Sequence, residues 1–519
     1  MLNLPIKILQ TQQIEAAQAT VEFTGINTLV AQWDALAKVT SRHLVLIVNA
    51  ASEDAVAQRD VELILNADGG ANYNYQYLEG EGVVPSAARA DGQTEIIPLP
   101  IPGTTYANAF GGGIILMPHA FNTVNHKAIL AMGGAAEDEV ETSVGRWASA
   151  AAVTSLALSL SAGNFAANSA FQLGVVDERY LVEEIDLAGG AGVPSFDNIP
   201  QGEGDLAVIA YARSDQAAVE DEVLHTINDD AIAANYPARE LLARAAVATT
   251  AYPVNQECAM VSGDNATALA FGIFAGTYFQ YIKGNRPLFI IESGYHESTG
   301  PTAENRVMAG VRYNTEPINK LRFEPNAGTN FIAGSLFSLY RVPKRIIERV
   351  ELTEDTPLVT FDNIPPNFES LLLHVYARTD RADILDFVDV EFNDDNVAAH
   401  YDYQNVRGRA AAADATQSLA AQFWFLVSGS TASAGSFGGG SLLLPGYAKT
   451  DRHKHGICLS ADIVDRVRID SDRWEDTTAI TKIDLSPNAG TNFLAGSVFE
   501  LEGILRREGL PPSEGMSVD

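Results

Sequence analysis

Cysteine, basic charge and long apolar runs are all scarce in this chain of 519 residues. The two cysteines, Cys258 and Cys458, do not fall at matching places in the repeats described below, so neither a disulfide framework nor a zinc site is predicted. No stretch approaches the roughly 18 consecutive apolar residues of a membrane helix, and the start lacks the basic and apolar regions of a secretion signal. We therefore expect a soluble protein that is not secreted and has no membrane partner.

Acidic residues outnumber basic residues by about two to one. The chain has 34 Lys and Arg against 66 Asp and Glu, for a net charge of −32. A surface of this sign repels nucleic acid, so no nucleic-acid partner is predicted. Hydrophobic residues make up 46% of the chain, which is enough to bury cores, and the length favours two to four domains.

The motifs of common enzymes are missing as well. We find no G-x-S-x-G elbow and no H-E-x-x-H pair, and the glycine runs at 111–113 and 438–440 lack the Lys-Ser/Thr of a P-loop. His453 and His455 are spaced to hold a metal from one strand face, but a solvated polar turn explains them better. The sequence therefore predicts no enzyme, no catalytic residue, no cofactor and no metal site.

What is present is a repeat. The segment Phe-Asp-Asn-Ile-Pro at 196–200 returns unchanged at 361–365, and Tyr-Ala-Arg at 211–213 returns at 376–378. A third, more divergent copy lies in the first third of the chain. It aligns with the other two on phenylalanines at 110, 274 and 437, each followed by small residues. We interpret the recurring residues as scaffold: Phe196, Pro200, Arg213, Phe361, Pro365, Arg378, Phe337 and Phe499.

The repeat divides the chain into three units and a tail. The first unit carries an insertion in which Leu29, Trp33 and Leu36 have helical spacing. Glu-rich joins near 178 and 345 are compatible with free linkers or with the first strand of each following unit, so the sequence leaves open whether the units pack or flex. The predicted ranges are 1–178 with an insertion at 27–43, 179–345, 346–506, and a flexible tail at 507–519.

Short β-type runs separated by turn residues dominate each unit. In 386–393 the apolar Val388, Val390 and Phe392 alternate with acids, as in a half-buried antiparallel strand. We therefore predict an all-β protein of three tandem antiparallel β-sandwiches, jelly-roll-like in connectivity. The alanine-rich run at 410–419 is compatible with a short helix or a loop.

Two repeated polar features invite a functional interpretation. Asn228 with Asp230, and Asn393 with Asp395, place oxygen ligands two residues apart as a Ca²⁺ loop does, although a structural Asx turn explains them better. The matched arginines, 213 and 378, are each followed two residues later by Asp. They are expected to form a local ion pair or to bond loop carbonyls.

The combined pattern F-x-x-I-P, then Arg-Ser/Thr-Asp, N-x-D and A-G-S-x-F-x-L resembles a repeat of virion structural proteins of tailed phages, of the tail-fibre or decoration type. The likeness is complete in the second and third units, and it carries no catalytic residues. It implies a non-enzymatic protein on the outside of the virion, in the capsid decoration or the tail, which is made in the host cytoplasm. Its expected partners are other virion proteins and further copies of itself.

Two more interpretations follow from the three-unit organisation. Three similar units in one chain can take the place of a trimer at a threefold position of a particle. As an alternative function, β-sandwiches often bind carbohydrate or a host receptor, and tryptophan rings are the usual stacking planes for a host-surface glycan. The four tryptophans are Trp33, Trp147, Trp424 and Trp474.

Overall fold

The predicted fold class is confirmed by the computed structural model, in which nearly every regular element is a strand. The predicted tail at 507–519 lies outside the described residues. The structure describes residues 3–135, 138–202, 204–244, 246–251, 255–282, 284, 286–296, 303–342, 346–409, 412–462 and 466–505.

Three similar sandwiches follow one another along the chain, and each pairs one eight-stranded sheet with one four-stranded sheet. The ladders are antiparallel. In the first unit the large sheet runs β1 (Ile6–Gln13), β12 (Ala170–Val176), β3 (Leu44–Ala50), β8 (Gly111–Met117), β9 (Lys127–Gly134), β10 (Glu139–Trp147), β5 (Tyr73–Glu81), β6 (Val84–Gln93). Its small sheet runs β2 (Thr20–Phe23), β11 (Leu156–Leu160), β4 (Gln58–Leu65), β7 (Ile96–Pro102).

The other two units repeat this strand order. The large sheet of the second unit runs β13 (Leu181–Asp186), β24 (Leu336–Val342), β15 (Asp205–Ala212), β20 (Gly272–Phe279), β21 (Leu288–His296), β22 (Ala303–Val311), β17 (Ala238–Arg244), β18 (Val247–Ala251). Its small sheet runs β14 (Ser195–Asp197), β23 (Lys320–Pro325), β16 (Glu220–Ile227), β19 (Glu257–Ser262).

In the third unit the large sheet runs β25 (Ile346–Glu351), β36 (Val498–Leu505), β27 (Phe368–Ala377), β32 (Gly438–Pro445), β33 (Lys454–Ala461), β34 (Arg466–Trp474), β29 (Tyr401–Arg409), β30 (Ala412–Ser418). Its small sheet runs β26 (Val359–Phe361), β35 (Ile483–Pro487), β28 (Leu385–Phe392), β31 (Phe423–Ser428). Short 3₁₀ helices lie at Glu178–Tyr180, Ala233–Asn235 and Ala398–His400.

The joins between units are structured. The Glu-rich stretches that follow 178 and 345 form β13 and β25, and each pairs with the last strand of its own unit. The alanine-rich run forms β30, which pairs with β29 over residues 412–418, while 410–411 lie outside the described residues. Over 412–418 the run is therefore neither a helix nor a loop, because a neighbouring strand supplies hydrogen bonds that local sequence does not reveal.

The insertion in the first unit forms the helix α1 (Ile26–Ala37), as its spacing predicts. The predicted face is partly wrong. Ile26, Val30 and Trp33 are buried against the first sandwich, whereas Leu36 is 72% exposed. The helix begins beside a strand end, and its contact with the sandwich selects this face.

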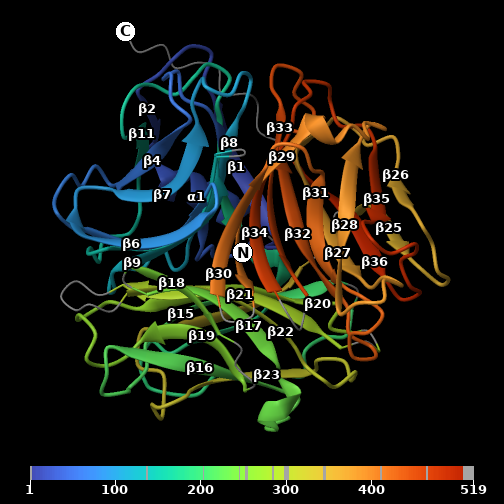
Figure 1. The fold of residues 1–519 in the computed structure, drawn as a ribbon. Helices are drawn as coiled ribbons and strands as arrows, with labels where there is room; N and C mark the ends of the chain where they lie inside the picture. Colours follow the sequence, from blue (N-terminus) through green and yellow to red (C-terminus); the bar gives the residue numbers. More distant parts are fainter. Residues whose placement is uncertain are drawn as a thin grey trace.

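The hydrophobic interior consists of three private cores and one shared core. Each private core fills the space between the two sheets of one unit. The shared core draws on the other face of all three large sheets, and includes Leu78, Leu241 and Val406 at equivalent positions. Figure 1 accordingly shows the three units, coloured blue, green and orange, gathered around one centre.

This arrangement explains two kinds of strand in the sequence. All seven residues of β3 are buried, because its sheet packs on both faces. In β28 buried and half-buried residues alternate, because its small sheet packs on one face only. The large sheets therefore lie between the private cores and the shared core.

Candidate functional site: the junction of the three units

The three units meet through a contact that recurs at each interface. In each unit a loop between two central strands of the large sheet donates a backbone N–H to a carbonyl of the next unit. The pairs are His126 to Leu269 at 3.1 Å, Arg286 to Gly435 at 3.3 Å, and His453 to Asn108 at 2.9 Å. Because the contacts run from first unit to second, second to third and third to first, the ring is closed with approximate threefold symmetry.

A second contact recurs at the three interfaces, and at one of them it is made by different side chains. The hydroxyl of Tyr211 donates to the carbonyl of His126 at 2.5 Å, and that of Tyr376 donates to the carbonyl of Arg286 at 2.9 Å. Each tyrosine ring stacks on a phenylalanine of its own unit, with centroids 4.8 Å from Phe271 and 4.9 Å from Phe437. Two interfaces thus share one design.

In the first unit the tyrosine position is Asn49, and the third unit reaches it with an arginine. The Arg452 guanidinium donates to Asn49 Oδ1 at 2.8 Å and to the Asn168 carbonyl at 2.7 Å, and it lies 4.0 Å from the centroid of the Phe110 ring. Arg452 is 1% exposed. The third interface therefore depends on a buried cation.

These contacts correct two sequence interpretations. Phe271, not Phe274, is the counterpart of Phe110 and Phe437, because Gly272 opens β20 as Gly111 and Gly438 open β8 and β32. The segment 451–455 is only partly solvated: Asp451 is exposed and His453 is half-buried, whereas Lys454 and His455, at the start of β33, are each 1% exposed. Arg452 and the backbone of His453 make the contacts of this segment with the first unit, and nothing in the local sequence indicates that packing.

Two buried lysines lie next to this junction. The Nζ of Lys127 donates to the Asn125 carbonyl at 2.7 Å, and the Nζ of Lys454 donates to the Arg452 carbonyl at 2.9 Å. Burial lowers the pKa of each lysine to about 8, because the charged form loses its hydration. Burying a positive charge at the junction is thus unfavourable in free energy, although the junction contains several basic side chains.

The repeated arginines act inside their own units. Both guanidinium groups are nearly buried and donate to carbonyls of the loop that precedes the fourth strand of the large sheet. Arg213 bonds the carbonyls of Thr267, Ala270, Asp264 and Ala266, and Arg378 those of Ser433, Ser436, Ser430 and Ala432. Of the two expected roles, these arginines therefore stabilise a loop rather than a local pair with Asp215 or Asp380.

The Asn-x-Asp sites are turns whose oxygens are already used. Asn228 has a φ of 53°, and its Oδ1 accepts from the backbone N–H groups of Asn319 and Lys320. Asp230 accepts from the N–H of Ile232 and from the side chain of Asn235. The third-unit pair, Asn393 and Asp395, repeats the pattern with equivalent partners. These oxygens are thus engaged in the fold.

The remaining scaffold residues lie in the private cores or at their ends. Phe196, Phe361, Phe337 and Phe499 are completely buried. The carbonyls of Pro200 and Pro365 each accept a hydrogen bond from a tyrosine hydroxyl, that of Tyr281 and Tyr447 respectively. Their repetition therefore reflects packing.

The tryptophans offer little surface to a sugar. Trp147 and Trp474 are at most 2% exposed. The indole N–H of Trp147 donates to Asp68, in the first unit's Asn-x-Asp turn at 66–68, and that of Trp474 donates to Asp395. Trp33 is 9% exposed and lies below the side chain of Arg179. Only Trp424 is half-buried, and its ring packs on Phe387.

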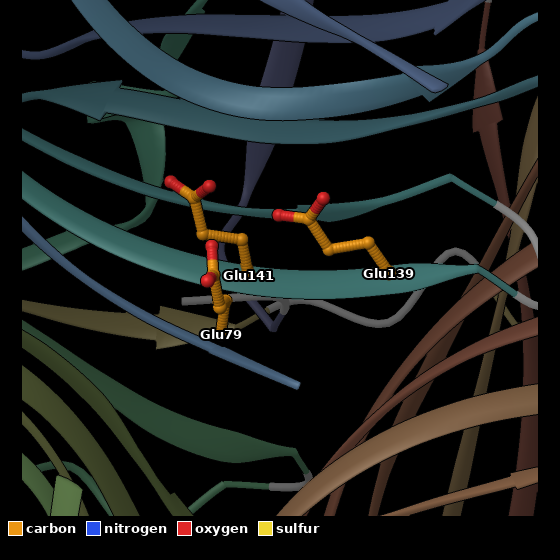
Figure 2. A group of neighbouring side chains, drawn as sticks. All are labelled: Glu79, Glu139 and Glu141. Carbon is orange, nitrogen blue, oxygen red and sulfur yellow. The ribbon is translucent and has the colours of Figure 1, made fainter. Parts of the chain in front are cut away.

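One group of side chains in the described part of the chain is spaced for a metal ion, and the sequence reasoning missed it. Glu79 on β5 and Glu139 and Glu141 on β10 bring carboxylate oxygens within 4.8 Å of one another, as Figure 2 shows. They project between the sheets of the first unit. An alignment of the three units on Trp147 would have indicated these three glutamates from the sequence.

Burial and mutual repulsion set the electrostatics of this cluster. Both raise the pKa of Glu139 and Glu141 well above the usual glutamate range, with burial the larger cause and nearby carboxylates the next. The pKa of Glu79 is also raised by burial, although a hydrogen bond from Ser86 opposes the shift. The cluster therefore favours any partner that neutralises it.

A scan against protein-family models found no match, and a search of curated proteins found none. Among solved structures, the LG1-3 region of the laminin alpha2 chain is 9% identical, covering 94% of this chain and 96% of that chain with a TM-score of 0.14. Domains LG4-5 of the mouse laminin alpha1 chain are 11% identical, covering 62% and 89%, also with a TM-score of 0.14. At such TM-scores the likeness says nothing about function, and the fold class rests on the strands themselves. None of the helices in the described ranges has the length and apolar character that crossing a membrane requires.

Proposed function

We propose that this protein is a non-enzymatic structural protein on the outside of a tailed phage or related virus, as a capsid decoration or a part of the tail. The observation that carries the proposal is the closed ring of three units with a core common to all of them. One chain thereby has the shape that otherwise requires three subunits, and such a shape matches a threefold or pseudo-threefold position of a symmetric particle.

The way the ring is built supports a mechanical role. The shared core joins the large sheets over much of their length, and the backbone contacts at His126, Arg286 and His453 close the ring. A body of this kind resists bending between units, unlike domains on free linkers. Stiffness of this sort suits a component that must keep its shape on a particle.

Charge supports exposure on a particle exterior. The net charge of −32 keeps such a surface from binding the packaged nucleic acid and favours solubility at high local concentration. The sequence resemblance to virion structural proteins points in the same direction, and it is strongest in the second and third units.

The test is binding to isolated particles. Purified protein is imaged by negative stain and weighed by mass photometry, alone and after mixing with empty capsids or with tails of candidate phages. We expect a compact triangular particle that attaches at regular positions to capsids, or at one position on tails. Attachment to neither, across phages whose genomes encode the protein, would contradict the proposal.

A matched variant sharpens the test. Arg452→Ala removes the buried cation of the third interface without altering the outer sheets, so it is expected to loosen the ring and reduce attachment. Arg322→Ala, which removes a partly exposed ion pair with Glu324, serves as the control and is expected to attach normally. The carbohydrate-binding alternative has less support, because three of the four tryptophans are buried; a glycan array tests it directly.

A further inference from the structure

The large sheets carry one buried position at which the three units differ in the sign of the charge. Trp147, Arg312 and Trp474 occupy equivalent places, since each donates to the aspartate of its Asn-x-Asp turn. Six residues before each of them on the same strand face lie Glu141, Arg306 and Arg468. Two units therefore have a cation where the first has an acid.

In the second and third units this cation neutralises buried acids. Arg306 is 4% exposed and pairs with Glu304 at 2.8 Å and with Glu240 at 3.1 Å. Arg468 is 1% exposed, pairs with Asp470, and lies 4.9 Å from the centroid of the Tyr403 ring. Each guanidinium gives a buried carboxylate a partner of opposite charge between the sheets and opposes the rise in pKa that burial causes.

In the first unit the guanidinium is replaced by an acid. Glu139 lies where the second unit has Glu304, and Glu79, which lies opposite Glu141, takes the place of Leu242 and Arg407. Glu139 and Glu141 are 3% and 2% exposed, and one carboxylate oxygen of Glu141 is buried without a hydrogen-bond partner. The side-chain oxygen of Gln58, whose amide bonds Glu139, is buried without a partner too. An unpartnered, deeply buried carboxylate oxygen facing two other carboxylates is the feature that a bound cation would explain.

We propose that Glu79, Glu139 and Glu141 bind one Ca²⁺ ion, which takes the place of the guanidinium of the other two units. All three ligands are oxygens of carboxylates, the type that Ca²⁺ prefers over the nitrogen and sulfur ligands of zinc or copper. Two oxygens on opposite sides of a Ca²⁺ ion lie roughly 4.6–5.2 Å apart, and the spread of the three ligand atoms, within 4.8 Å, fits inside that span.

The surroundings favour entry and retention of a cation. Glu79 is half-buried and Glu81 at the end of the same strand is exposed, so the cluster reaches solvent at this edge. Asp60 on the facing small sheet adds negative potential, as it acts on all three glutamates. The hydroxyls of Tyr75 and Tyr77 are the other titratable groups nearby, and acids including Glu141 raise the pKa of both.

The experiment measures Ca²⁺ binding to the full chain after treatment with EDTA, by isothermal titration calorimetry and equilibrium dialysis at pH 7.5. We expect one Ca²⁺ per chain and a rise in melting temperature that EDTA reverses. Glu141→Gln and Glu79→Gln are expected to weaken binding at least tenfold, and Glu141→Arg, which copies the other units, is expected to abolish it.

Glu183→Gln, an exposed acid of the second unit, is the control and should leave binding unchanged. Circular dichroism establishes that each variant is folded, and Glu79→Gln, at the half-buried position, keeps the test valid if the deeper variants fail to fold. The proposal is overturned if the wild-type chain binds no stoichiometric Ca²⁺ at millimolar concentration. Binding that persists in the folded Glu141→Arg variant, binding of wild-type strength in the folded Glu79→Gln variant, or tighter binding of Mg²⁺ than of Ca²⁺, would overturn it equally.

Discussion

The first unit and the third have the same strand order, but they carry buried side chains of opposite charge at one equivalent position. In the third unit Arg468 lies beside Asp470 between the sheets, whereas in the first unit Glu141 lies beside Glu139 and Glu79. The same backbone thus accepts either sign at one position. The difference teaches that the repeat keeps the packing of the sheets, while the charge between them is set separately in each unit.

A second difference separates the first unit from the other two. Arg213 and Arg378 each bond four carbonyls of one loop, but the first unit has Ala51 at this position. The corresponding loop, 103–110, is one residue shorter. Its N–H groups at 104 and 105 bond the carbonyls of Asp54 and Val56, and the loops of the other two units make the equivalent backbone bonds in addition to those from the arginine. The first unit therefore differs from the other two both in the length of this loop and in having no arginine at the position that bonds it.

The largest effect is expected from removing these arginines. Arg378→Met and Arg213→Met leave buried carbonyls without donors, so each should lower the free energy of unfolding by about 3 kcal/mol. Arg322→Met, at a partly exposed ion pair, should cost less than about 1 kcal/mol. Urea denaturation measures all three, and equal losses would mean that the loop carbonyls find water and that the contrast with Ala51 has no energetic basis.

A smaller effect is expected where the strands of different units cross. A Cβ on Gly408 would lie 2.8 Å from the Glu240 carbonyl oxygen, and one on Gly80 would lie 2.7 Å from that of Asn405, whereas the second unit has Ala243 at this place. Gly408→Val should therefore lower the free energy of unfolding by about 2 kcal/mol through overpacking.

The control for this prediction is Gly189→Val, at which no atom lies within 4 Å of the added Cβ. Small-angle scattering should show an expanded particle for Gly408→Val and an unchanged one for the control. A Gly408→Val chain as compact and as stable as the wild type would show that the approach of the units relaxes easily.

The smallest effect is a pH dependence of unusual sign. Because the raised pKa of Glu139 and Glu141 belongs to the folded chain, the folded state binds more protons than the unfolded state above the ordinary glutamate value of 4.5. In EDTA, this cluster should therefore lose stability as pH rises from 4.5 toward the raised values.

Thermal melts of wild type and Glu141→Arg in EDTA measure the difference. The Arg variant should lack the contribution of this cluster, and Ca²⁺ should remove it from the wild type. Identical pH profiles for the two chains would mean that the three glutamates do not repel one another in the folded state.

Much of the fold was predictable from particular residues. The alternation of Val388, Val390 and Phe392 predicts a strand with one buried face, and β28 has that pattern. The repeated Phe196 and Phe361 predict core positions, and both are buried. The junction was not predictable in the same way, because Arg452 and Asn49 lie 403 positions apart and neither belongs to a repeated motif.

The sequence by itself determined the all-β class, the three units and their turns, because alternation, Asx chemistry and repetition are local properties of the chain. Only the tertiary structure decided that the large sheets share a fourth core, that Arg452 is buried, and that Glu79 meets Glu139 and Glu141. The physical reason is that these contacts join strands and units distant in sequence, so they depend on how whole sheets pack rather than on any segment.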